Sequence, residues 1–354
     1  MSQSLLRWKA LWNPDMYHGW GRENRYFEGW YIKIVDNTEG VALAFIPGIS
    51  MAKDGTKHAF IQVLDGKQCT VAYHRFDAFE FKPSDTSFFL QIADNQFSTH
   101  KIKLNLPNIV GELTFENPVP WDKMYGAPGI MGWFSFMPFM ECYHGVVSLD
   151  HTISGTLTIN DKKNDFTNGR GYIEKDWGIS FPRAWIWLQT NHFFEKNADF
   201  TDITEGVSIS QNLNSTQTSL LKQPISLIAS VAHIPFLGTY FIGYIVGFLY
   251  KGKLHRFATY TGAKMKANID GNDICLYFKN SIYELHITAT KAGTGSLISP
   301  IQGEMTGKVN ESLQANIHIK FFEHGKLIFE GVGRNAGLEA AGEVDVLLTD
   351  KWRR

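Results

Sequence analysis

The chain has 354 residues, of which 44% are hydrophobic and 19% are charged, and its net charge is -1 at neutral pH. This length corresponds to about two domains, each large enough to bury its own core. The composition argues against a disordered chain, and the near-neutral charge argues against electrostatic capture of nucleic acid.

The N-terminal residues 1–21, MSQSLLRWKALWNPDMYHGWG, contain only isolated Leu and Trp among polar residues. They lack the apolar core and the small-residue cleavage site of a signal peptide. The three cysteines, Cys69, Cys142 and Cys275, are far apart and in no metal-like spacing, which fits free thiols in a reducing compartment. We therefore expect a cytoplasmic protein without disulfides.

Short β-strand patterns, broken at intervals by Gly, Asn and Asp, run along the whole chain, and helical periodicity is weak. One apolar stretch, 130–140, predicts a short helix or an apolar loop before Pro138. Many short strands at this spacing are typical of an antiparallel barrel or sandwich. Apart from two stretches considered below, the predicted strands cover residues 27–36, 41–49, 58–65, 86–94, 100–106, 110–117, 152–160, 274–280, 283–290, 304–310, 315–323 and 326–333.

The strand pattern and the length together predict an all-β fold of two antiparallel β-barrels or strongly curved sheets. We place one in residues 1–165 and the other in residues 166–354. The join is expected near NDKKNDFTNG, residues 160–169, because this segment is polar and poor in apolar residues. The two units should then meet near residues 160–175.

Residues 171–193, GYIEKDWGISFPRAWIWLQTNHF, combine acids with tryptophans. Burying an ionised carboxylate is costly, and a solvated loop would carry fewer tryptophans, so the mixture indicates a site. Strand alternation places Glu174 and Asp176 on one face. The same alternation places four side chains of the next strand together, which we predict to line one cavity: Trp185, Trp187, Gln189 and Asn191.

From Gln223 to Tyr250 the chain has no Lys, Arg, Asp or Glu, and this stretch is long enough to span a bilayer. Two prolines and several glycines interrupt it, and Val, Ile, Phe and Tyr occur in short runs. This pattern favours consecutive buried strands over a membrane helix. We predict strands at about 225–233 and 239–250.

Glu28 is a carboxylate on a strand face that is otherwise formed by Trp30 and two isoleucines. Each candidate residue also has a structural explanation. Glu28 can pair with Arg25 or Lys33 in water, and Asp176 can hydrogen-bond the backbone of its turn. The paired tryptophans after that turn can be core residues, with the two amides satisfying backbone groups.

Three blocks carry a family resemblance: FEGWYIKIV, IMGWFSFMPFMECYHGVVSLDHTISGTL and YIEKDWGISFPRAWIWLQTNHF. In this order they strongly resemble the motif blocks of the tocopherol cyclase family, from about Pro14 to Tyr260. The resemblance implies a pair of calycin-like, lipocalin-related β-barrels. For plant and cyanobacterial members it also implies cyclisation of a prenylated hydroquinone to a chromanol.

Chromanol closure protonates an alkene and lets a phenol oxygen capture the cation, so it needs an acid, an aromatic lining and exclusion of water. A carboxyl group in apolar surroundings can stay protonated near neutral pH, and indole faces can stabilise the passing charge. The candidate acids, in order, are Asp176, Glu28 and Glu174. The candidate substrate-binding residues are Trp30, Trp177, Trp185 and Trp187 as walls, and His144, Gln189 and Asn191 for a polar head group.

We therefore expect an isomerase-type enzyme that performs acid-initiated cyclisation, or hydration, of a prenylated lipophile without a cofactor. The alternative is a non-catalytic, lipocalin-like protein that binds a lipophile in an apolar barrel. The 12 histidines show no recognisable zinc spacing, so no metal is predicted. The expected partner is a lipophilic small molecule, without nucleic acid, without a transmembrane segment, and with transient membrane contact at most.

Overall fold

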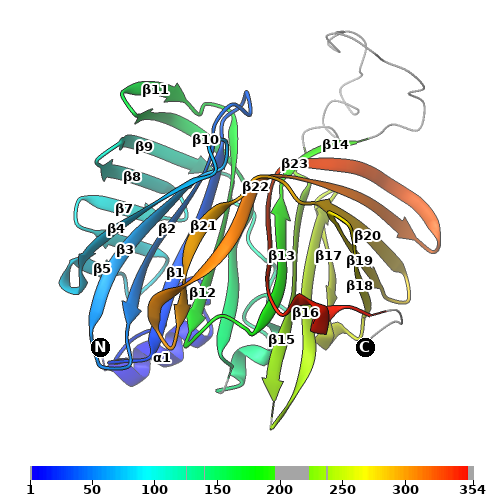
Figure 1. The fold of residues 1–354 in the computed structure, drawn as a ribbon, viewed down its shortest axis with the longest axis horizontal. Helices are drawn as coiled ribbons and strands as arrows, with labels where there is room; N and C mark the ends of the chain where they lie inside the picture. The colour runs from blue at the N-terminus through cyan, green and yellow to red at the C-terminus, as the bar shows by residue number, and fades with distance from the viewer. Residues whose placement is uncertain (1, 125, 139, 196–222, 237, 350–354) are drawn as a thin grey trace.

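The computed structural model describes residues 2–124, 126–138, 140–195, 223–236 and 238–349. Two antiparallel sheets, of 12 and 11 strands, lie side by side (Figure 1). The helices in this part of the chain are α1, Gln3–Leu11, and four short 3-10 helices. One of these, η2, spans Gly132–Phe136 in the apolar stretch that predicted a short helix or loop. The predicted all-β fold is confirmed.

The first sheet contains the strands up to Gly178. Its strands pair in the order β4-β3-β2-β1-β12-β10-β9-β8-β7-β6-β5, and β11 pairs with β10. Their bounds are β1 Tyr26–Val35, β2 Ala42–Met51, β3 Lys57–Asp65, β4 Thr70–Asp77, β5 Phe81–Pro83, β6 Phe89–Ile92, β7 Asn95–Ser98, β8 Lys101–Leu106, β9 Ile109–Glu116, β10 Cys142–Ile159, β11 Lys162–Asp165 and β12 Gly169–Gly178.

The second sheet contains the strands from Ala184 onward. Its strands pair in the order β17-β16-β15-β13-β23-β22-β20-β19-β18, while β14 pairs with β23 and β21 with β22. Their bounds are β13 Ala184–Thr190, β14 His192–Glu195, β15 Ser226–Phe236, β16 Thr239–Tyr250, β17 Lys253–Ala258, β18 Lys264–Asp270, β19 Asp273–Lys279, β20 Tyr283–Thr290, β21 Gly295–Ile301, β22 Glu304–Glu323 and β23 Lys326–Gly342.

Strand alternation gives the molecule three apolar cores. Trp30 and Ile32 of β1 belong to a core enclosed by the first sheet, and Ile186 of β13 belongs to one enclosed by the second. Tyr31 and Trp187, on the opposite faces of the same two strands, meet in a third core between the sheets. The faces of β1 and β13 that look toward each other therefore define the interface.

The charge-free segment forms β15 and β16, as predicted. The two strands pair along their whole length, from Phe236 opposite Thr239 to Ser226 opposite Leu249. No helix among the described residues is long and apolar enough to cross a membrane.

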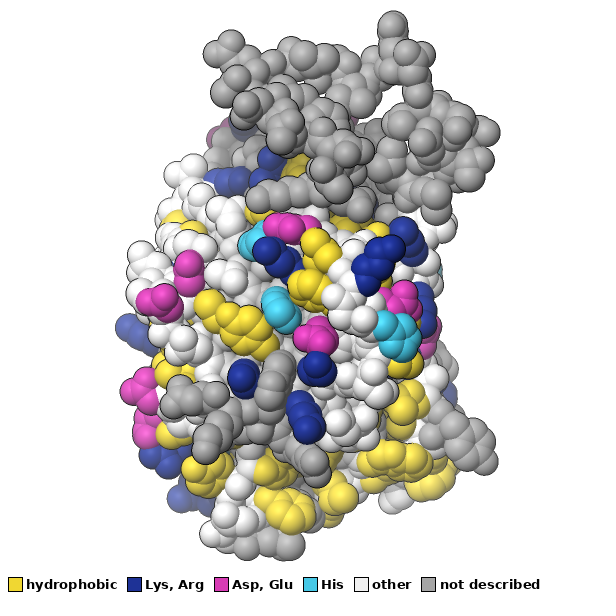
Figure 2. Space-filling view, turned by 90° about the vertical axis from the view of Figure 1, so that its right-hand side faces the viewer, with side chains coloured by type: hydrophobic (Ala, Val, Ile, Leu, Met, Phe, Trp, Pro, Cys, Tyr) yellow, Lys and Arg dark blue, Asp and Glu magenta, His cyan; other side chains and the backbone are white. Residues whose placement is uncertain are grey.

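Both signs of charge occur on the side of the molecule formed by the second sheet. Figure 2 shows Lys and Arg side chains interspersed there with acids, histidines and hydrophobic side chains. This distribution agrees with the net charge of -1. The face shown therefore differs from the basic stripe that is typical of nucleic-acid-binding proteins.

The chain passes from the first sheet to the second between Gly178 and Ala184, later than the predicted join. The polar segment 160–169 contains β11, which forms a hairpin with β10 in the first sheet. Each sheet is an open path of paired strands over the described residues, running from β4 to β5 and from β17 to β18. Closed barrels and the division into two domains at residues 165 and 166 stay predictions.

Candidate active site

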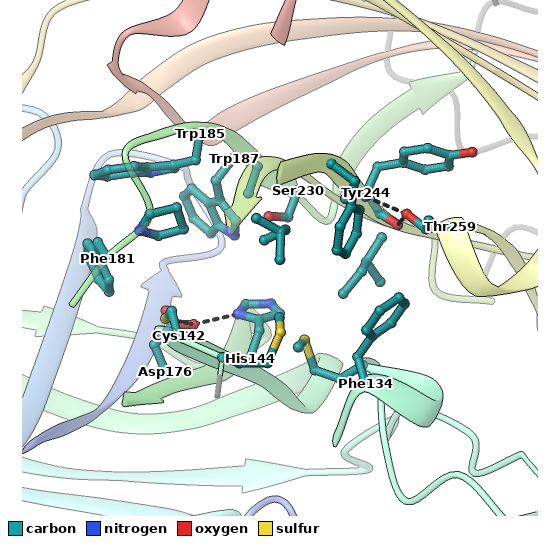
Figure 3. Close-up of a pocket in the computed structure, with 18 of the residues that line it drawn as sticks. Phe134, Cys142, His144, Asp176, Phe181, Trp185, Trp187, Ser230, Tyr244 and Thr259 are labelled. Carbon is teal, nitrogen blue, oxygen red and sulfur yellow. Dashed lines mark hydrogen bonds and ion pairs between the residues drawn. The ribbon is translucent and has the colours of Figure 1, made fainter. Parts of the chain in front are cut away.

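A cavity of about 810 Å³, part of it open to solvent, lies between the two sheets. This first cavity is lined from β10, β12 and η2 on one side and from β13, β15, β16 and β23 on the other. Figure 3 shows Trp185 and Trp187 across the cavity from His144 and Asp176. Much of the remaining wall is apolar, including Met131, Phe134, Met140, Ile234, Phe241 and Ile245.

A second cavity, of about 610 Å³ and also partly open to solvent, adjoins the first. Its walls come from β1, β2 and β3 of the first sheet and from β21 and β22 of the second. The two cavities share four lining residues, which are Asp176, Phe181, Trp187 and Glu339. The shared residues mark the junction of the cavities.

The predicted alternation along β12 is confirmed. Glu174 and Asp176 line the second cavity, whereas Trp177 packs into the core enclosed by the first sheet. The side chain of Asp176 is 28% exposed and also lines the first cavity, but Glu174 is buried behind it. The strand thus brings one accessible and one buried carboxyl group to the junction.

The tryptophans of β13 donate hydrogen bonds to carboxyl groups. The indole N–H of Trp187 donates to Oε2 of Glu174 at 3.1 Å. The indole N–H of Trp185 donates to Oε2 of Glu339 at 2.6 Å. The first of these bonds explains why the stretch 171–193 carries both an acid and an indole, since the buried carboxyl group of Glu174 needs a donor.

Two acids of this site, Glu311 and Glu339, were missed by the sequence analysis. They lie opposite each other on β22 and β23, and the Tyr31 hydroxyl donates to Glu311. Glu311 falls between two predicted strands, so no face could be assigned to it. Glu339 follows Leu338 in a run of Ala and Gly, and this isolated acid was a signal comparable to that of Glu28.

Burial raises the pKa of the acids at the junction. It raises the pKa of Glu174 to about 7, although the nearby His144 acts in the opposite direction. It also raises the pKa of Glu339 to about 7, with the charge of Glu174 adding to the effect and the Trp185 hydrogen bond reducing it. The pKa of Glu311 is held well above its ordinary value by burial and by the charge of Glu339. These groups can hold protons near neutral pH.

His144 connects the acids of β12. Its Nδ1 lies 2.8 Å from Oδ1 of Asp176, and its Nε2 lies 3.5 Å from Oε2 of Glu174. Burial acts to lower the pKa of His144, but the charges of Asp176 and Glu174 outweigh it and raise the value to about 9. His144 is therefore an imidazolium at neutral pH, and it donates the hydrogen bond to Asp176.

The same three groups have the composition of a possible cation site. One nitrogen of His144 and one oxygen each of Glu174 and Asp176 lie within 4.8 Å of one another. These atoms already pair with one another, and Glu174 also accepts from Tyr172 and Trp187. We assign no metal to them.

Glu28 lies elsewhere, in the core enclosed by the first sheet. Its carboxylate pairs with Lys175 at 2.5 Å and accepts hydrogen bonds from the Tyr26 hydroxyl and the His18 and Gly19 backbone. Burial acts to raise the pKa of Glu28, but Lys175 and His18 outweigh it, and the net shift is downward. The structure therefore does not bring Glu28 to the cavity, and its partner is neither of the two cations considered from the sequence.

The remaining candidate residues are distributed over three places. Trp30 stacks on Phe88 and Trp177 stacks on His18, both on the side of the first sheet away from the cavity. Gln189 is buried, and its side-chain amide has no hydrogen-bond partner among the described residues. Asn191 donates to Asp150 and to the carbonyl of Gly171. Of the four side chains predicted to share a cavity, only Trp185 and Trp187 line the first cavity.

The fold and the site define an all-β protein with a mainly apolar internal cavity that ends on buried carboxyl groups. The model of the tocopherol cyclase-like family matches residues 113–342, and the chain belongs to this family. The region of motif resemblance runs from about Pro14 to Tyr260, so the family match begins later and extends further toward the C-terminus.

Two plant proteins are among the relatives of this chain. It is 20% identical over 224 residues to a probable chloroplastic tocopherol cyclase of Oryza sativa subsp. japonica, a match that covers 60% of this chain and 42% of that protein. It is 22% identical over 225 residues to the chloroplastic tocopherol cyclase of Zea mays, covering 60% and 41%. The chain thus spans about two fifths of the length of these relatives. A cytoplasmic location stays a prediction.

Solved structures with a similar chain course share little sequence with it. The crystal structure of a putative AttH from Nitrosomonas europaea aligns with a TM-score of 0.48 at 13% identity, covering 89% of this chain and 92% of that one. The crystal structure of CghA with Sch210972 aligns with a TM-score of 0.48 at 10% identity, covering 90% and 89%.

Proposed function

We propose that this protein is an enzyme that cyclises a prenylated lipophile by protonating an alkene, with Glu339 as the general acid. One observation carries the proposal: Glu339 is only partly buried, lines both cavities, and has a pKa raised to about 7 by burial. A general acid works best when its pKa lies near the working pH. The names of the plant relatives support a cyclase.

Asp176 was the first candidate acid from the sequence, and its contacts support a different role better. It is paired with the His144 imidazolium at 2.8 Å and lines both cavities beside Glu339. A carboxylate in this position can accept the proton that a substrate hydroxyl releases. We therefore assign Asp176 the part of the base and His144 the part of the group that orients it.

The proposed reaction balances without a cofactor. The Glu339 O–H bond breaks, and the alkene π electrons form a C–H bond with its proton at the less substituted carbon. The tertiary cation accepts an electron pair from the phenol oxygen, which forms the C–O bond and gives its proton to Asp176. Return of one proton from Asp176 to Glu339 restores the starting state. A water molecule in place of the phenol would give hydration instead.

The alternative is a lipophile-binding protein without catalysis. A specific observation favours it: each acid at the junction already has a protein hydrogen-bond donor, from Tyr31, Tyr172, Trp185, Trp187 or His144. Acids with protein hydrogen-bond partners can be structural, since buried polar groups need partners in any protein.

Turnover in deuterated buffer separates the two functions. We expect a prenylated hydroquinone to yield a chromanol with one deuterium on the carbon next to the new tertiary centre. Glu339→Gln should lower the rate by about 10²- to 10⁴-fold, the usual contribution of a general acid. Glu304→Gln, at the exposed start of β22, is the matched control. Binding without any product in the unmodified protein would favour the alternative, and full turnover in Glu339→Gln would eliminate Glu339.

A further inference from the structure

The first cavity already contains the proposed acid and base and has apolar walls for the tail of a substrate. The proposed reaction therefore does not require the second cavity. This cavity is nevertheless of similar size, about 610 Å³ against about 810 Å³. Both walls contain aromatic and aliphatic side chains, but the second has three polar side chains that do not line the first. They are Gln62, Glu174 and Glu311, and they lie there with the rings of Phe27, Tyr31 and Phe60.

The groups assigned to the reaction lie where the two cavities meet. Glu339 and Asp176 both line both cavities, as do Phe181 and Trp187. A substrate bond that reacts between Glu339 and Asp176 is therefore accessible from two sides. Two parts of a substrate that extend from that bond in opposite directions therefore enter different cavities.

We propose that the two cavities form one two-lobed binding site, in which the isoprenoid tail of the substrate occupies the first cavity and its aromatic ring occupies the second. This inference rests on the proposed function and names the shape of its substrate. In a prenylated hydroquinone the reacting alkene is one methylene away from the ring, so ring and tail leave the reacting bond in opposite directions. A junction with an acid and a base suits this arrangement.

The chemistry of the walls decides which lobe takes which part. Both cavities contain aromatic rings and aliphatic side chains, so the polar groups distinguish them. The carboxyl groups of Glu174 and Glu311 line only the second cavity, where they can accept hydrogen bonds from ring hydroxyls, and Phe60 can pack against the ring. The first cavity has the flexible Met131 and Met140, which adapt to a branched aliphatic chain.

One isoleucine in each cavity provides a matched pair of variants. Ile245 of β16 lines the first cavity, and Ile46 of β2 lines the second. Both are only partly buried and belong to the rim of the same core between the sheets, so Trp at either position fills the adjoining cavity. Ile282, which is 41% exposed in the turn between β19 and β20, gives the control Ile282→Trp.

Binding to the full chain would be measured by calorimetry with three probes: trimethylhydroquinone for the ring, farnesol for the tail, and a farnesylated hydroquinone for both. Ile245→Trp should weaken farnesol at least tenfold and leave the ring probe unchanged. Ile46→Trp should do the reverse, and both should weaken the two-lobed probe. Thermal unfolding tests whether each variant is folded. If a Trp variant does not fold, Phe is introduced at the same position instead.

Three outcomes overturn the inference. In the first, Ile46→Trp leaves the binding of all probes unchanged, and in the second, each variant weakens the binding of farnesol and of trimethylhydroquinone equally. In the third, Ile245→Trp weakens the ring probe and Ile46→Trp weakens farnesol. These measurements need no turnover. If the expected binding pattern is found and no chromanol forms, the two-lobed site stands and the proposed reaction fails.

Discussion

Glu311 and Glu339 lie directly opposite each other on β22 and β23, and the pKa of each carboxyl group is raised by burial. Like charges at directly opposed positions of a sheet are destabilising. The pair is therefore compatible with the fold only if at least one member keeps its proton. Tyr31 donates to Glu311 and Trp185 donates to Glu339, so each carboxyl group also has a fixed hydrogen-bond partner. The second sheet thus carries a proton-holding pair at the interface.

The first prediction concerns stability against pH in Glu339→Gln. The pKa of Glu339 is about 7 in the folded protein, above its ordinary value of 4.5, so the folded state binds more protons between these two values. The stability that Glu339 contributes is present below about pH 4.5 and is lost as the pH rises through about 7. Glutamine has no such dependence. We expect Glu339→Gln to gain stability relative to the unmodified protein between pH 5 and pH 8.

Urea unfolding at pH 5 and at pH 8 measures the difference in stability between Glu339→Gln and the unmodified protein. The control Glu304→Gln changes an acid at the exposed end of β22 and should show nearly the same stability difference at both values. A stability difference for Glu339→Gln that is constant with pH would show that its carboxyl group is ordinary.

The strands of this protein were largely predictable because their signals are local. Alternation within 27–35 correctly separated Trp30 and Ile32 from Tyr31. Short runs of Val, Ile, Phe and Tyr, interrupted by Pro and Gly, correctly predicted β15 and β16. The point where the chain changes sheets was not predictable from polarity. Segment 160–169 is polar because β11 is an exposed hairpin strand, and the true change follows Gly178 in a stretch rich in aromatic residues.

The site was predictable only where it is local. Glu174, Asp176, Trp185 and Trp187 lie in one short stretch of the chain. Alternation correctly placed the two acids on one face and the two tryptophans in one cavity. The pairing of Glu339 with Trp185 joins residues 154 positions apart, and only the strand order brings β23 beside β13. Lys175 lies between the candidate acids Glu174 and Asp176 in the sequence, but its side chain points to the opposite face of the sheet and pairs there with Glu28. Nothing in the sequence indicated this pairing.

The second prediction separates a structural Glu28 from a catalytic one. Glu28 and Lys175 are fully buried and 2.5 Å apart, so Glu28→Gln leaves an ammonium group buried without its carboxylate. Breaking a buried pair in this way costs about 3 to 5 kcal/mol. We expect a large loss in urea unfolding, and partial recovery when Lys175→Met is added. If Glu28→Gln instead has nearly normal stability but has lost turnover, Glu28 is again a candidate for the general acid.

The third prediction concerns Asp176 and its partner. Asp176→Asn keeps the size of the side chain but removes the charge that contributes most to raising the pKa of His144 to about 9. The pKa of His144 should fall, because burial still lowers it and only the charge of Glu174, 3.5 Å from Nε2, still raises it. Titration of the histidine ring signals by NMR measures the shift, with the His144 signal assigned from its loss in His144→Asn. Glu330→Gln, beside His318 on the second sheet, should leave it unchanged.

The same variant decides whether the His144–Asp176 pair serves the reaction or only the fold. If Asp176 accepts the substrate proton, Asp176→Asn should bind the farnesylated hydroquinone normally and turn it over about 10²- to 10⁴-fold more slowly. The lost rate should not return at higher pH, because the amide cannot take up a proton at any pH used. If the pair is only structural, the variant loses about 1 kcal/mol for a hydrogen bond, and turnover per folded molecule hardly changes. A shifted His144 titration with normal turnover would confirm the electrostatic coupling and remove Asp176 from the mechanism.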